Sequence, residues 1–185
     1  RDLDLLVGSQ ATVSITITTL DDTLARRMEP GAPPPSRRLD AVARLADEGV
    51  PVSVRIDPIV PGLNDDPDML ASLVAEVASA GAKHIVTSTY KARPDSLARL
   101  TREFPDRAQL WRRLYREEGE RIHGYYYLPR SLRVKLLMPV VTEARKRGLT
   151  YATCREGLTS RAFFCSPTCD GTHLIPPRSG RVTGL

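Results

Sequence analysis

The sequence has few of the residues and motifs that identify common protein classes. Only 3 of its 185 residues are cysteine, and 5% are aromatic. Three cysteines are an odd number and too few for a disulfide scaffold, so we expect a cytoplasmic protein. The apolar runs, such as residues 50–54, are broken well before the roughly 18 residues that a membrane span needs, so no membrane partner is expected.

Several catalytic motifs are also missing from the sequence. It contains no Walker loop, no G-x-G-x-x-G, no G-x-S-x-G and no H-E-x-x-H. Each of these motifs sets a nucleophile, a metal or a phosphate into a fixed backbone geometry. Without them, hydrolases of the common motif types lose support.

Positive charge is concentrated in the second half of the chain. The net charge is +5, but residues 1–90 carry 8 Lys and Arg against 13 Asp and Glu, whereas residues 91–185 carry 19 against 9. Most of the cations are Arg, which forks onto phosphates and stacks on bases, so DNA or RNA is an expected partner. The same bias also follows from genome composition, and the Arg of residues 99–121 alternate with Glu as on a solvated helix face.

Strand and helix patterns alternate along the sequence. Residues 11–19 alternate small polar with β-branched apolar side chains, which predicts a strand with Ser14, Thr16 and Thr18 on one face. Further strands are predicted over 50–56, 83–89 and 149–153. Helices are predicted over 36–49, 66–81, 94–121 with a break near 104–106, and 131–147 with Pro139 inside it.

This order predicts an α/β fold of repeated βα units around a parallel sheet, of the TIM-barrel type. We expect residues 1–124 to form the partial barrel and residues 125–185 a basic helix with a Cys- and His-containing segment. In such barrels the carboxyl ends of the strands carry the chemistry. If the fourth strand belongs to the same sheet, Thr18, Asp57, Tyr90 and Cys154 converge on one mouth.

All three cysteines lie in the tail. Cys154, Cys165, Cys169 and His173 have the spacing C-x10-C-x3-C-x3-H. Three thiolates and an imidazole complete a tetrahedral zinc site or hold an iron–sulfur cluster. The alternative is a set of buried free thiols with His173 bonded to the neighbouring backbone.

Two other segments allow both a functional and a structural interpretation. Asp57-Pro58 and residues 61–65 form a predicted loop at a strand end, which either holds an adenine or a ribose or is a simple turn. Residues 125–127 are three consecutive tyrosines beside Arg121 and Arg130, which either stack bases or belong to the core.

Five segments of the first half resemble one family. Residues 13–19, 24–33, 38–39, 49–52 and 57–65, the last reading Asp-Pro-Ile-Val-Pro-Gly-Leu-Asn-Asp, are similar to the radical S-adenosylmethionine proteins of the spore photoproduct lyase-like group, also labelled DNA repair photolyase-like. The resemblance covers residues 7–90. The tail, with Cys-Arg-Glu-Gly and Cys-Asp-Gly-Thr-His, resembles archaeal-type members of the group.

The resemblance implies a radical S-adenosylmethionine enzyme of lyase type, with a partial (β/α)6 barrel. In that family a C-x3-C-x2-C motif holds a 4Fe–4S cluster, and cleavage of S-adenosylmethionine gives a radical that abstracts a hydrogen atom, here from a nucleic-acid lesion. The resemblance places the cofactor at Thr16, Thr18, Asp57, Pro58 and Asn64, and makes Glu29 and Arg38 a structural pair.

The family's cluster motif does not occur in this sequence. We therefore expect the cluster ligands upstream, in an N-terminal part of the same protein, and expect this chain to be the second half of the barrel. A different class of function stays open, a nucleic-acid-binding module in which the four tail residues hold zinc. A catalytically silent α/β scaffold is the third possibility.

Overall fold

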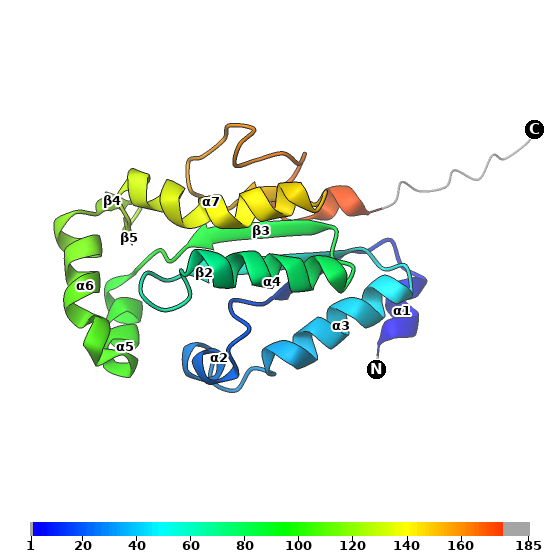
Figure 1. Cartoon of the computed structure of the whole chain (residues 1–185), viewed down its shortest axis with the longest axis horizontal. Helices are drawn as coiled ribbons and strands as arrows, with labels where there is room; N and C mark the ends of the chain where they lie inside the picture. Colours follow the sequence, from blue (N-terminus) through cyan, green and yellow to red (C-terminus); the bar gives the residue numbers. More distant parts are fainter. Residues whose placement is uncertain (1, 176–185) are drawn as a thin grey trace, which may run out of the picture.

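A four-stranded parallel sheet forms the centre of the computed structural model, which describes residues 2–175 (Figure 1). Its strands are β1 (Val13–Thr16), β2 (Val52–Ile59), β3 (His84–Thr89) and β6 (Thr150–Thr153), and they lie side by side in that order. All three neighbouring pairs are parallel. The predicted α/β class with a parallel sheet of βα units is confirmed, and the fourth strand belongs to that sheet.

Three helices cover one face of the sheet, α3 (Pro35–Asp47), α4 (Pro67–Ser79) and α7 (Arg130–Lys146) (Figure 1). The capping residues and glycines of the sequence mark the ends of these helices. Asp66 caps α4, its Oδ1 accepting from the amides of Asp68 and Met69. A glycine with positive φ follows α3, α4 and α7, at Gly49, Gly81 and Gly148. No helix within residues 2–175 is long and apolar enough to cross a membrane.

Alternation along the strands puts the apolar side chains under these helices. In β2, Val52, Val54 and Ile56 are fully buried, and Ile85 in β3 is their fully buried neighbour. Burying one such side chain stabilises the fold by roughly 1.5–3 kcal/mol, so this layer is a main source of stability. The helix residues that complete it are Val42, Leu70, Leu73, Val74, Val77, Leu137, Val140 and Val141.

The stretch between β3 and α7 forms one end of the molecule (Figure 1). It contains α5 (Pro94–Glu103), the single turn η1 (Pro105–Arg107), α6 (Ala108–Arg112) and a π-helical turn η2 (Arg113–Glu117), so the predicted break near 104–106 is confirmed. An antiparallel hairpin of β4 (Glu120–Ile122) and β5 (Tyr125–Tyr127) follows. Its two-residue turn has positive φ at His123 and Gly124, the conformation that suits the twist of a tight hairpin.

Two short helices and the hairpin were not predicted. The helices are α1 (Leu3–Val7) and α2 (Asp22–Met28), whose 5 and 7 residues are too few to show a helical period. One prediction was wrong in position. Residues 57–59 belong to β2 and not to a loop, because Ile59 pairs with Thr89 after an irregularity in the ladder at Ile56.

The tail runs back along the sheet. Phe164 bridges antiparallel to Ala152, so residues near 164 line the outer edge of β6. Gly171, next to the turn η3 (Thr172–Leu174), then lies against Ser53 of β2 on the face opposite the helices. Residues 1–124 and 125–185, predicted as separate parts, therefore contribute strands to the same sheet.

Candidate functional site

The second face of the sheet is polar. Side chains that are paired in register on neighbouring parallel strands lie on the same face, so they form rows across the sheet. The row nearest the amino ends is Ser14, Ser53, His84 and Thr150. The next row is Thr16, Arg55, Val86 and Ala152. The hydroxyl face predicted for the first strand is thus continuous with polar side chains along the first row and with Arg55 in the second, where Val86 and Ala152 are apolar.

The tail closes the amino-terminal row. The imidazole of His84 is fully buried, with Nδ1 2.9 Å from Thr150 Oγ1 and Nε2 3.4 Å from the Cys169 carbonyl. The ring of His173 packs edge-on against it at 4.9 Å. Burial lowers the pKa of His84 to about 4, so the ring is neutral at pH 7. This end of the polar face is occupied by the chain itself.

A cluster of polar side chains remains at the carboxyl ends of the strands. Asp57 Oδ2 accepts from Arg55 Nη2 and Asp57 Oδ1 accepts from Ser88 Oγ, each at 2.5 Å. The two charged side chains keep 30% and 19% of their surface exposed. Burial lowers the pKa of Arg55, but hydrogen bonding and charge from Asp57, with a smaller contribution from Cys154, raise it above its usual value. We call Arg55, Asp57, Ser88 and Cys154 the inner-face cluster.

The cluster contains two of the four residues predicted to meet at the mouth, Asp57 and Cys154. Tyr90 turns toward α5, where its hydroxyl donates to Ser96 Oγ at 2.7 Å. Thr18 is also diverted, because its hydroxyl donates to Glu29 Oε1 at 2.7 Å. The expected convergence is therefore partial.

The predicted pair of Glu29 and Arg38 is confirmed, with Arg38 Nη1 2.6 Å from Glu29 Oε2. The same Arg38 nitrogen donates to the Thr16 carbonyl at 2.8 Å. Together with the Thr18 hydroxyl, this pair fixes the end of β1 to the segment between α2 and α3. Of the predicted cofactor residues, Thr16 ends β1 and shares a face with Arg55. Thr18, two residues beyond the strand, is 3% exposed and serves this connection.

Asn64 and Pro58 also have a structural role. Asn64 is 2% exposed, and its amide nitrogen donates to the carbonyls of Thr18 and Pro58 while its oxygen accepts from the Val60 amide. Every polar atom of the side chain is used by the backbone. The side chain thus clamps the ends of β1 and β2 together, and its contact with a cofactor stays a prediction.

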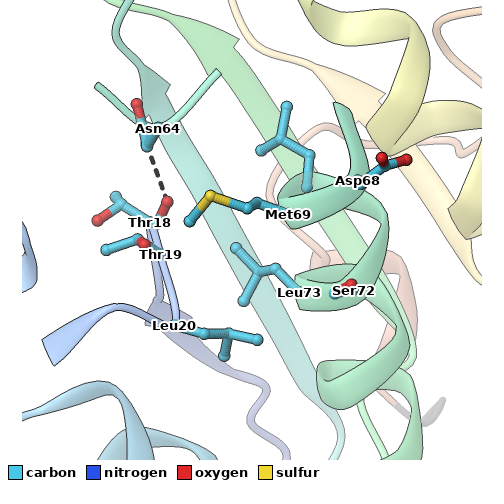
Figure 2. A pocket seen from close by; sticks show the side chains of 9 residues that line it. Thr18, Thr19, Leu20, Asn64, Asp68, Met69, Ser72 and Leu73 are labelled. Carbon is cyan, nitrogen blue, oxygen red and sulfur yellow. Dashed lines mark hydrogen bonds between the residues drawn. The ribbon is translucent and has the colours of Figure 1, made fainter. Parts of the chain in front are cut away.

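This clamp borders a pocket of about 220 Å³ between the end of β1 and α4 (Figure 2). Figure 2 shows the hydrogen bond from Asn64 to Thr18 at its rim and the side chains of Leu20, Met69 and Leu73 around it. The lining is mainly apolar, and the pocket lies on the helix side of the sheet. It is therefore separate from the inner-face cluster.

The tail residues do not form the predicted metal site in the described part of the chain. Within residues 2–175 no three His, Cys, Asp or Glu side chains are grouped as a metal would require. Cys165 and Cys169 are exposed, and His173 lies between the hydroxyls of Thr150 and Thr168 at 3.1 and 3.0 Å. Cys154 belongs to the inner-face cluster instead. The zinc-stabilised module depends on this site and loses its main support.

A buried ion network beside the cluster had no sequence signal. The side chain of Glu156 is fully buried, and its Oε1 accepts from Lys91 Nζ and from the Thr89 amide, both at 2.7 Å. Arg133, 4% exposed, lies 3.7 Å from Glu156 Oε2 and also pairs with Glu120 of β4. The network joins the ends of β3 and β6 to the hairpin. An isolated Glu in a polar tail gives no hint that it is buried.

The amino-acid sequence is similar to several known proteins. No known family model matches the sequence. Uncharacterized proteins of Mycobacterium tuberculosis and Mycobacterium bovis are 28% identical over 159 residues, which cover 80% of this chain and 45% of theirs. A radical SAM Nalpha-GlyT isomerase of Pseudomonas phage M6 is 26% identical over 145 residues, 76% of this chain and 30% of the isomerase. The chain has a radical SAM relative.

A solved structure shares the architecture of this chain. The crystal structure of Streptococcus suis SuiB superimposes with a TM-score of 0.50 and 16% identity, over 83% of this chain and 30% of SuiB. This likeness shows a shared fold alone, and the radical S-adenosylmethionine resemblance inferred from the sequence is supported by the distant relation to the phage isomerase. The chain spans less than half the length of these relatives, 45% of the mycobacterial proteins and 30% of the isomerase.

Proposed function

We propose that this chain is part of a radical S-adenosylmethionine enzyme, and that its polar sheet face forms one wall of the reaction site inside a partial βα barrel. The observation that carries the proposal is the inner-face cluster, in which an Arg, an Asp, a Ser and a Cys from three adjacent parallel strands meet at the carboxyl edge. Ligands of α/β sheets bind at this edge. The relation to the phage isomerase supplies the reaction class.

The cluster fits the polar groups of S-adenosylmethionine, which carries a carboxylate, an ammonium group and ribose hydroxyls. Arg55 has five N–H donors and directs one of them to Asp57, so others are free for a carboxylate. Arg55 and Ser88 each hold one oxygen of Asp57 and fix its orientation toward an ammonium or a hydroxyl. When bound and reduced, S-adenosylmethionine supplies the group that abstracts a hydrogen atom.

The described residues do not fit an iron–sulfur cluster. Cys154 lies beside Arg55, whereas Cys165 and Cys169 are exposed in the tail, and no three ligands meet within residues 2–175. We therefore place the cluster ligands in the remaining length of a longer protein, as the relatives' greater length allows. No step of the chemistry is assigned to the tail cysteines.

The finer parts of the proposal rest on the family resemblance. We propose a nucleic-acid-type substrate, as in spore photoproduct lyase-like proteins, and a lyase-type outcome of the hydrogen abstraction. The concentration of Arg in residues 91–185 agrees with an anionic substrate but does not select one.

The test is the affinity for S-adenosylmethionine of the natural full-length protein that carries this sequence, purified without oxygen. Asp57→Asn should weaken binding at least tenfold, because the amide loses the charge that faces the ligand. Asp95→Asn is the matched control, since Asp95 also pairs with an Arg, at 3.4 Å, but on the exposed surface of α5. Equal affinities of the two variants would remove Asp57 from the binding site.

A further inference from the structure

The basic side chains of the second half differ in whether a carboxylate neutralises them. Four of them on and beside the helices are neutralised by neighbouring carboxylates. These are Arg99 with Asp95, Arg107 with Asp106, Arg112 with Glu117 and Arg113 with Glu118. The Arg-rich helices therefore present mixed charge, and the excess of positive charge must lie elsewhere.

Four arginines without an ion pair in the described part of the chain gather around the hairpin. Arg93 and Arg155 lie over the ring of Tyr125, with the guanidinium carbon 5.2 and 5.9 Å from the ring centre. Arg116 and Arg121 lie over the ring of Tyr126 at 4.4 and 5.8 Å. All four arginines are exposed, and among residues 2–175 none of them forms an ion pair. We call these six residues the tyrosine–arginine surface.

This surface borders the reaction edge. Arg155 follows Cys154 of the inner-face cluster, and Arg93 lies four residues beyond the end of β3. In Figure 1 the hairpin and α5 lie beyond the arrow tip of β3, the end toward which the strands point. Arg133, buried beside Glu156, pairs with the half-exposed Glu120 of β4 and fastens the hairpin there. Arg155 therefore links the surface to the inner-face cluster through its neighbour Cys154.

The backbone at Arg155 supports a functional role. Its φ is 55°, in the left-handed region that favours glycine and costs another residue roughly 1 kcal/mol. Two residues later Gly157 has a φ of 66° without that cost. The conformation brings the Arg155 guanidinium over Tyr125, and strained residues of this kind concentrate at binding sites.

We propose that the tyrosine–arginine surface binds an unpaired, single-stranded stretch of nucleic acid beside the reaction site. The choice of nucleic acid as the substrate class rests on the proposed function. Four guanidinium groups without an ion pair among the described residues suit a chain of regularly spaced phosphates. Arg116 Nη1 already donates to the Tyr126 hydroxyl at 2.9 Å, and the remaining N–H groups of Arg116 can donate to a phosphate. Two half-buried tyrosine rings offer stacking for bases, which an acidic peptide would not use. A duplex would hide its bases from these rings.

The experiment measures binding of the full-length protein to a fluorescent 20-nucleotide single strand by anisotropy, without S-adenosylmethionine or reductant. The double variant R93Q/R155Q should raise Kd at least tenfold. The slope of log K against log salt should fall by about 1.4, because two phosphate contacts are lost. R112Q/R113Q removes the same charge from two arginines paired with Glu117 and Glu118 and should change Kd less than about threefold.

A second variant separates stacking from charge. Y126L should raise Kd about tenfold and leave the salt slope unchanged. Y126F keeps the ring and loses only the hydroxyl that accepts from Arg116, so it should raise Kd less than about threefold. Equal weakening by both arginine pairs, or equal affinity for a duplex or for polyglutamate, would overturn the proposal. Because no cofactor is present, loss of S-adenosylmethionine binding in the earlier test would leave this result unaffected, and the reverse also holds.

Discussion

Replacement of Glu156 by Gln tests the buried ion network. The carboxylate is fully buried and is the counter-charge for Lys91 and Arg133, which are 6% and 4% exposed at the side chain. Gln has the same shape but no charge. The variant therefore leaves the ammonium group of Lys91 and the guanidinium group of Arg133 in a site from which water is largely excluded. Among the described residues, Glu120 is then the carboxylate that pairs with Arg133.

The expected loss of unfolding free energy is about 3–5 kcal/mol, the usual cost of leaving one partner of a buried pair unpaired. The assay is urea denaturation at pH 7. Glu103→Gln is the control, because its pair with Arg27 has a comparable N–O distance of 2.9 Å but side chains 45% and 50% exposed. That variant should lose less than about 1 kcal/mol.

A double variant tests the pair of Lys91 and Glu156 as a unit. Lys91→Met combined with Glu156→Gln removes both charges of the shorter pair and should recover part of the loss, since an apolar replacement of a buried pair is often near neutral. If Glu156→Gln costs no more than Glu103→Gln, the network does not hold the ends of β3 and β6 together as inferred.

Three further stability predictions follow from single contacts. The pKa of buried His84, about 4, is below its unfolded value of 6.5, so the unfolded state takes up the proton first. About 3 kcal/mol of stability, complete above pH 7, should be lost as the pH falls from 6.5 to 4, and His84→Gln should flatten that part of the pH profile. Gly171→Ala should lower the free energy of unfolding in urea by about 1–3 kcal/mol, because φ is 87° and the new Cβ would lie 2.8 Å from Ser53 Cβ. An unchanged stability would mean that the tail does not pack there. Asn64→Ala should lower the free energy of unfolding by about 2–4 kcal/mol, because an amide and carbonyls at the strand ends lose their partner. Urea denaturation measures this loss, and Thr19→Ala, in the wall of the same pocket, should cost less.

Local patterns in the sequence were sufficient for the sheet and its covering helices. Helices α4 and α7 carry apolar residues at helical spacing and end at glycines. Strands β3 and β6 follow them as short runs that are rich in Thr and in β-branched or aromatic residues. Such signals depend on neighbours within a few residues. The hairpin was missed because three tyrosines and three residues before the turn are too few to show a strand period.

The site was predicted less completely, because it depends on contacts between distant residues. Asp57 and Cys154 were identified as strand-end residues, but Arg55 and Ser88 complete the cluster only because β2 and β3 are neighbours in a particular register. Asn64 looked like a ligand residue since its partners, the carbonyls of Thr18 and Pro58, could not be known from spacing. The tail cysteines were grouped by sequence distance, whereas the fold separates Cys154 from the others by returning the tail along β6.

The most direct measurement of the proposed function is product formation by the natural full-length protein that carries this sequence, reconstituted with iron and sulfide and reduced without oxygen. S-adenosylmethionine should be converted to 5′-deoxyadenosine and methionine, and Asp57→Asn should lower the rate at least tenfold while Asp95→Asn keeps it. A protein that binds iron and sulfide but forms no 5′-deoxyadenosine would contradict its assignment as a radical S-adenosylmethionine enzyme.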